Sequence, residues 1–214
     1  MRVHPTALAV LLAAPSGAAS PPAVTTVGLV WFDPQDTLPD RFSDLRQEVD
    51  SIFRGIGVEV QWTRGGPGTV YDLGGRPQVA VILVAEDRSK GPRSIMGLVL
   101  RSQRPTRVAW VFVNNVRAAL GHDPRRARPS LVEAPELARA VARVAAHEVV
   151  HAIAPDQPHA REGLMSQALG RPFLLGERAT IDPRCASAFL SRLAERSPTL
   201  EATLALGTVP VPGP

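Results

Sequence analysis

The first part of the chain alternates between two hydrophobic periods. Residues 24–32 are apolar and rich in β-branched side chains, which is typical of a strand. Across residues 37–57 the apolar positions recur at steps of four and three, the period of an amphipathic helix: Leu38, Phe42, Leu45, Val49, Ile52 and Ile56. Thr37, with an acid three residues later, predicts the N-cap, and two glycines close the pattern. Residues 58–63 then alternate apolar and polar side chains, which predicts a second strand.

Three further strands are predicted in the middle of the chain. Residues 79–85 are apolar on both faces, which favours a central strand of a sheet. Residues 94–101 contain a short apolar run, and residues 108–113 form the last predicted strand. Residues 114–134 show neither period, so we expect a loop there.

A long helix is predicted from residue 135 into the segment 147–151. The following residues recur at helical spacing: Leu137, Val141, Val144, Ala145 and Glu148. Arg139 and Arg143, four residues apart, predict its exposed side. Pro155 cannot continue a helix, so the chain is expected to turn back after Ala154.

The two ends of the chain differ from the part between them. Arg2, the apolar residues 7–14 and the small residues that follow indicate a signal peptide over residues 1–19, and hence a secreted or periplasmic protein. One domain is expected over residues 20–196. Its last helix is predicted over residues 183–196, where Asp182-Pro183 supplies an N-cap and first turn. Residues 197–214 are rich in Thr, Ala, Pro and Gly and predict a loosely ordered tail.

Composition narrows the class of protein without identifying it. The chain has 214 residues, of which 44% are hydrophobic and 21% charged, as in globular proteins. The net charge is only +4, and Lys90 is the single lysine. This preference for arginine, with abundant Ala, Pro and Gly, is better explained by a GC-rich bacterial genome than by a nucleic-acid partner. Cys185 is the only cysteine, which excludes an intramolecular disulfide and predicts a buried apolar role.

Residues 147–151 read His-Glu-Val-Val-His and carry the strongest chemical signal in the sequence. On a helix, His147 and His151 lie on one face, one turn apart, and can offer two imidazole nitrogens to one cation. Glu148 projects at an adjacent angle, poorly placed to be a third ligand. Shuffled chains of this composition contain such a motif roughly once in two hundred, so its place on a predicted helix matters. Zinc on two such imidazoles, with a glutamate beside its water, is the core of a metal-dependent hydrolase.

A catalytic zinc needs a third protein ligand and leaves its fourth position to water. The loop after Pro155 brings His159 back over the helix end, eight residues beyond His151. We therefore predict His159 as the third ligand. Three carboxylates compete for the same role: Asp156, Glu162 and Glu177.

Gly163-Leu164-Met165, shortly after His159, resembles the methionine-containing turn that lies beneath the metal in metzincins, a group of zincin proteases. The order His-Glu-x-x-His, seven residues, His and then Gly-Leu-Met also resembles secreted bacterial metzincin-like proteins. Ala154 stands where metzincins usually have a glycine, and Gln157 stands where they usually have the third ligand. The loop to the third ligand is thus two residues longer than usual. The resemblance covers residues 147–165.

This resemblance implies an α+β, zincin-like fold. It consists of a twisted mixed sheet of about five strands with one antiparallel edge strand, a backing helix, an active-site helix and a C-terminal helix. Residues 94–101 would be the edge strand, which in metzincins lies over the cleft and can pair with an extended substrate. A plain hairpin strand without any substrate role is an equally good interpretation of the same residues.

The resemblance also implies zinc-dependent hydrolysis of peptide bonds, more typical of an endopeptidase than of an exopeptidase. Zinc would bind His147, His151 and His159, and Glu148 would act as general base. Some metzincins stabilise the oxyanion with a tyrosine just past the methionine. The only tyrosine here is Tyr71, far upstream, so that role stays open, with Arg161 as the neighbouring candidate.

Two other functions compete with the hydrolase. One is a catalytically silent zincin-fold domain that binds a metal or a peptide, and the other is a globular protein whose motif is accidental. For the hydrolase, the expected partner is a peptide or protein substrate. We expect a monomer with no nucleic-acid partner and no stable membrane span, because residues 7–14 are too few to cross a bilayer.

Overall fold

Five strands form one mixed sheet in the computed structural model, which describes residues 24–66, 77–86, 95–100, 107–124, 126 and 128–196. The elements are β1 (Thr25–Phe32), α1 (Phe42–Arg54), β2 (Val58–Arg64), β3 (Gln78–Val84), β4 (Gly97–Leu100), β5 (Arg107–Phe112), α2 (Val113–Ala119), α3 (Glu133–Ile153), α4 (Arg171–Leu175) and α5 (Pro183–Arg196). The strand order is β2-β1-β3-β5-β4. The pairs β1–β2, β1–β3 and β3–β5 are parallel, and β4 runs antiparallel to β5 at the edge.

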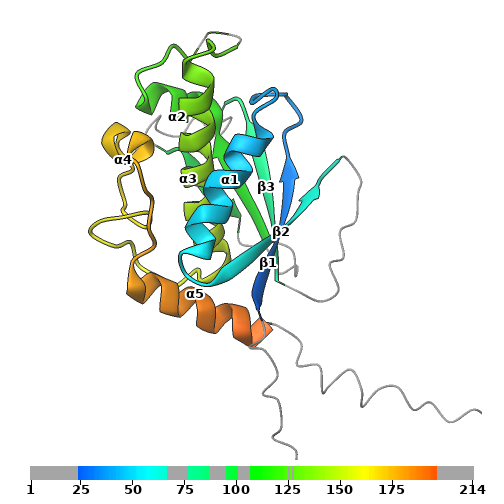
Figure 1. The fold of residues 1–214 in the computed structure, drawn as a ribbon, viewed down its shortest axis with the longest axis vertical. Helices are drawn as coiled ribbons and strands as arrows, with labels where there is room; N and C mark the ends of the chain where they lie inside the picture. Colours follow the sequence, from blue (N-terminus) through cyan, green and yellow to red (C-terminus); the bar gives the residue numbers. More distant parts are fainter. Residues whose placement is uncertain are drawn as a thin grey trace, which may run out of the picture.

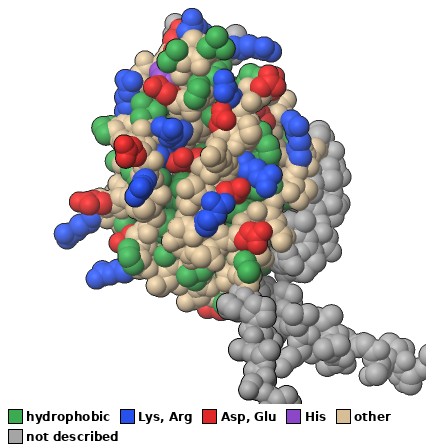
Figure 2. All heavy atoms as spheres, in the orientation of Figure 1, with side chains coloured by type: hydrophobic (Ala, Val, Ile, Leu, Met, Phe, Trp, Pro, Cys, Tyr) green, Lys and Arg blue, Asp and Glu red, His purple; other side chains and the backbone are tan. Residues whose placement is uncertain are grey.

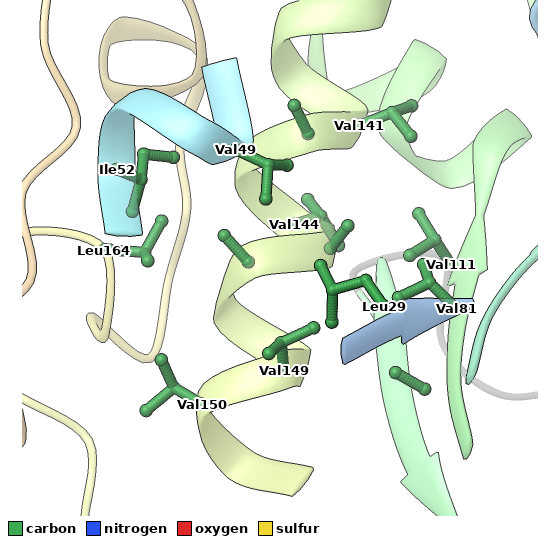
Figure 3. Close-up of a cluster of buried hydrophobic side chains, with 14 of the residues drawn as sticks. Leu29, Val49, Ile52, Val81, Val111, Val141, Val144, Val149, Val150 and Leu164 are labelled. Atoms are coloured by element: carbon green, nitrogen blue, oxygen red, sulfur yellow. The ribbon is translucent and has the colours of Figure 1, made fainter. Parts of the chain in front are cut away.

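The helix that carries the histidine motif lies in the centre of the molecule. Figure 1 shows α1 and α3 side by side on the sheet, with α5 passing below them. Every residue from 140 to 150 is buried, and four of these residues are alanines, which let neighbouring elements approach the helix closely. In Figure 3 the valines of α3 lie between Leu29, Val81 and Val111 of the strands and Val49 and Ile52 of α1. This packing on both sides fixes the position of α3.

Several sequence predictions agree with this arrangement. β3, apolar on both faces, is the middle strand of the sheet, and β4 is the antiparallel edge strand. The last helix spans the predicted range and is capped by Asp182, whose Oδ1 accepts a hydrogen bond from the Arg184 amide at 2.9 Å. Ala186, Phe189 and Leu193 of this helix are buried, Leu190 packs partly buried against the core, and Cys185 is buried as predicted.

The start of α1 was predicted too early. The helix begins at Phe42 and is not capped by Thr37. Instead, the Asp33 carboxylate accepts hydrogen bonds from the Thr37 amide and hydroxyl at 2.9 and 3.0 Å and from the Leu38 amide at 3.1 Å. Asp40 has a φ of 58°, a left-handed conformation that a right-handed helix cannot contain. The acid expected to complete the capping box thus belongs to a turn.

The loop predicted over residues 114–134 is also wrong in part, because residues 113–119 form α2. Its apolar face is only one turn long, too short to stand out as a period in the sequence. The Asn115 side chain donates a hydrogen bond to the Ile95 carbonyl at 2.7 Å, and the Phe112 amide donates one to the Met96 carbonyl at 2.8 Å. The short helix therefore helps to hold the segment that leads into β4.

Arg143 was predicted on the exposed side of α3 and is instead fully buried, whereas Arg139 is exposed. The Nε of Arg143 donates a hydrogen bond to Glu48 Oε1 of α1 at 2.7 Å. Its terminal nitrogens donate to the carbonyls of Phe173 and, at 2.8 Å, of Gly176. Periodicity treats every arginine as a surface residue, but a guanidinium whose donors all find partners can be buried.

The ends of the chain, predicted as a signal peptide (1–19) and a tail (197–214), lie outside the described residues. Within the described part, no helix is both long enough and apolar enough to cross a membrane. On the face shown in Figure 2, blue arginines and red acids are interspersed and form no patch of one sign.

We expect Arg143→Ala to lower the free energy of unfolding by about 3 kcal/mol, because it leaves Glu48 and two backbone carbonyls without their donor. Arg139→Ala, one turn away on the exposed side, is the matched control and should change it by less than about 0.5 kcal/mol. Urea unfolding of both variants measures this difference. Equal destabilisation by the two substitutions would contradict the assigned role of Arg143.

Candidate metal centre

The three histidines predicted as ligands lie together at the C-terminal end of α3. The Nε2 atom of His151 is 3.1 Å from that of His147 and 3.2 Å from that of His159. A tetrahedral zinc with nitrogens at 2.0–2.1 Å separates its ligand atoms by about 3.3 Å. The two distances fit two edges of such a tetrahedron, and the ligand nitrogens of all three histidines lie within 4.8 Å of one another. Among the described residues, these histidines form the one group of three or more side chains suited to hold a metal ion.

The longer loop to His159 is closed by short-range hydrogen bonds and by contacts with α5. Helix α3 ends at Ile153 with Ala154 as its C-cap, and the Gln157 amide donates a hydrogen bond to the Ala154 carbonyl at 3.1 Å, which turns the chain back. The Gln157 side chain donates to the Cys185 sulfur at 3.4 Å, and Asp156 pairs with Arg192 at 3.6 Å. The loop to His159, which is two residues longer than is usual in metzincins, thus forms a turn that packs against α5.

The turn at residues 163–166, which we call the Met-turn, holds two of the three ligands through its backbone. His147 Nδ1 lies 2.7 Å from the Leu164 carbonyl oxygen, so the ring donates its Nδ1 proton there and leaves the Nε2 lone pair free for a metal. The Met165 carbonyl accepts a hydrogen bond from the amide of Ala160, the residue after His159, at 2.8 Å. Leu164 and Met165 are fully buried, which keeps both carbonyls in place.

Glycine is required at the start of this turn. Gly163 has a φ of 78°, which side-chain-bearing residues rarely adopt. A β-carbon there would also lie 3.0 Å from the Thr180 carbonyl oxygen. That oxygen accepts a hydrogen bond from the Leu164 amide at 2.9 Å, so displacing it would disturb the residue that orients His147.

None of the described residues that competed for site roles belongs to the histidine cluster. Asp156 faces Arg192, while Glu162 and Glu177 are exposed, and none of the three carboxylates belongs to the histidine cluster. Arg161 is exposed and is not among the residues that line the adjoining cleft. Tyr71 lies outside the described residues.

Burial sets the protonation of the two helix histidines. It lowers the pKa of His147, and it lowers the pKa of His151 to about 4, with further contributions from the neighbouring imidazoles of His147 and His159. Both rings are therefore neutral at neutral pH. Neutral imidazole is the form that binds a metal ion.

Glu148 lies beside the histidines with 8% of its surface exposed, and burial raises the pKa of its carboxyl to about 7. Its side chain lies beneath β4 at Gly97, where a β-carbon would be 2.6 Å from Glu148 Cγ. No role was predicted for Gly97 from the sequence. A glycine inside a predicted strand often indicates that another group approaches the backbone closely, and this signal could have identified Gly97.

A cleft of about 710 Å³ opens over the metal centre. It is lined by His147, Glu148 and His159, by the residues from Ile95 to Gly97 at the start of β4, by small and apolar residues from α2 and α3, and by residues 167–170, of which only Gln167 has a polar side chain. The cleft therefore brings the histidine cluster, the carboxylate and the edge strand together.

The fold resembles that of one solved protein in particular. The crystal structure of archaemetzincin from Methanopyrus kandleri superposes with a TM-score of 0.50 over 83% of this chain and 99% of that chain, at 17% sequence identity. The architecture is zincin-like. No family model and no curated protein sequence matches the chain. At such low identity, the likeness concerns the fold, and the function has to be argued from the site itself.

We expect the wild-type protein to bind close to one equivalent of Zn²⁺ and His159→Ala to weaken this binding by at least about 100-fold, because one of three ligands is lost. Asp156→Ala, three residues earlier in the same loop, should leave zinc affinity within about threefold of wild type. Competition with a chromogenic chelator measures both. A loss of zinc in Asp156→Ala with retention in His159→Ala would reverse the ligand assignment.

Gly163→Ala should weaken zinc binding by about 10-fold to 100-fold, because it disturbs the carbonyl that orients His147. Gly57→Ala is the matched control, since Gly57 has a φ of 75° but no atom within 4 Å of the added methyl group, and it lies in the turn before β2. Both variants should lose similar stability, and only the first should lose zinc affinity. Equal zinc affinities in the two variants would argue against the Met-turn as a support for the metal centre.

Proposed function

We propose that this chain is a zinc-dependent metallopeptidase. The observation that carries the proposal is the convergence of three imidazoles on one point, with the Glu148 carboxylate beside them in a cleft. Three nitrogen ligands with an accessible fourth side are typical of catalytic zinc sites, whereas structural sites are closed by four protein ligands. The zincin-like architecture is consistent with this proposal.

Each side chain then has a defined task. His147, His151 and His159 hold the ion, and a zinc ion bound there supplies Lewis acidity for water and for the scissile carbonyl. Glu148 borders the cleft and has no other assigned role in the fold. We assign it as the general base that takes a proton from water and delivers it to the leaving amine.

The edge strand favours a peptide as substrate. β4 pairs with β5 on one side only among the described strands, so the backbone groups on its other side are available to an extended chain. The described cleft lining contains no Arg or Lys to bind a terminal carboxylate and no acid besides Glu148 to bind a terminal amine. We therefore propose endopeptidase rather than exopeptidase activity.

Location and assembly complete the proposal. The composition of residues 1–19 supports secretion or a periplasmic location. The interspersed charges of Figure 2 and the small net charge of +4 give no support to a nucleic-acid partner. We propose that the protein acts on peptides or proteins as a monomer.

Glu148→Gln tests the catalytic assignment. We expect it to reduce kcat/KM for casein or a quenched peptide library by at least about 1,000-fold, because an amide cannot accept the proton from water. Zinc affinity should stay within about threefold of wild type, since Glu148 is not a ligand. Chelation of zinc should abolish the wild-type activity, and added Zn²⁺ should restore it.

The same assays separate the competing functions. Stoichiometric zinc without cleavage of any peptide would exclude the peptidase and identify a silent metal-binding domain. Failure of the wild-type protein to bind zinc would show that the motif is accidental. Residual activity of Glu148→Gln near the wild-type level would remove the base assignment while leaving the metal centre intact.

A further inference from the structure

Gly97, the first residue of β4, lies directly against Glu148. A β-carbon at position 97 would lie 2.6 Å from Glu148 Cγ, 2.7 Å from Oε1 and 2.9 Å from Cδ. Side chains alternate along a strand, so the next residue, Leu98, faces the other side of the sheet, where it lines a hollow with Trp110. Position 97 is therefore the point of β4 that meets the carboxylate.

Space, not backbone conformation, explains the glycine. The described glycines with a positive φ are Gly57, Gly121 and Gly163, so the backbone of Gly97 is open to any residue. At six other glycines, an added β-carbon would approach no neighbouring atom more closely than 3.0 Å: Gly55, Gly57, Gly121, Gly163, Gly170 and Gly176. The volume that a side chain would take at position 97 is filled by Glu148.

Neither backbone in this contact is free to move apart. The start of β4 is held by the hydrogen bonds of the Ile95 and Met96 carbonyls with Asn115 and Phe112, and β4 itself pairs with β5. Glu148 belongs to the buried part of α3, and His147 next to it is tied to the Met-turn. A methyl group added at position 97 can be accommodated only by displacement of the Glu148 side chain.

We infer that Gly97 is a positioning residue that sets the place of the Glu148 carboxylate relative to the metal centre. This inference rests on the proposed function, in which that carboxylate is the base. Gly97→Ala should lower kcat by about 100-fold, because a shift of about 1 Å in a catalytic group has an effect of this size. The three atoms nearest to the added β-carbon belong to Glu148 and none to an imidazole, so zinc affinity should be unchanged, and KM should stay within about threefold.

A double-mutant cycle on the zinc-loaded full chain tests the contact without relying on activity. Gly97→Ala should lower the midpoint of thermal unfolding by roughly 2–4 °C when Glu148 is present. In a Glu148→Ala background the three clashing atoms are gone, so the same substitution should lower it by less than about 1 °C. Gly57→Ala, remote from the site, should leave kcat and zinc affinity at wild-type values.

The outcomes are distinct. A wild-type kcat in Gly97→Ala, a loss of zinc that accounts for its lower activity, or an equal fall of the unfolding midpoint in both backgrounds would each overturn the inference. If the zinc-loaded wild-type protein cleaves no peptide, the proposed function fails. The unfolding cycle then decides by itself whether Gly97 holds Glu148 in place.

Discussion

The histidine cluster proposed to bind zinc depends on two backbone carbonyls in the Met-turn. The Leu164 carbonyl fixes the ring of His147 from α3, and the Met165 carbonyl fixes the residue after His159 in the loop. Ligands from two separate parts of the chain are thereby held by one buried turn. Hydrogen bonds of this kind set the tautomer and orientation of metal-binding histidines and contribute strongly to metal affinity. The methionine of this turn is fully buried and belongs to the hydrophobic core.

The turn can act in this way because α3 cannot move. The helix is buried on nearly all sides, and Arg143 ties it to α1 and to the end of α4. The start of β4, on the other side of the cleft, is also held in place, by β5 and by α2. A site built on rigid elements keeps its geometry, and here Glu148 lies between the rigid helix and the rigid strand.

The sequence predicted those parts of the candidate site that follow from local patterns of residues. His147 and His151 could be paired because residues four apart lie on one face of a helix. The loop to His159 was predicted because Pro155 must end the helix. The centre of the sheet followed from the unbroken hydrophobicity of β3. The sequence did not predict the burial of Arg143, the seven-residue helix α2 or the contact of Gly97 with Glu148, since each depends on partners distant in sequence. A hydrophobic period reports whether a residue is apolar and cannot report whether a buried polar group finds its acceptors.

The central claim is that three imidazoles held by α3 and the Met-turn bind one zinc ion. A crystal structure of the zinc-loaded protein, with anomalous diffraction recorded at the zinc edge, tests it most directly. We expect one zinc peak at 2.0–2.1 Å, within about 0.2 Å, from Nε2 of His147, His151 and His159. His147 Nδ1 should remain bonded to the Leu164 carbonyl. A peak coordinated by Asp156 or Glu162 in place of His159, or no zinc at the three rings, would contradict it.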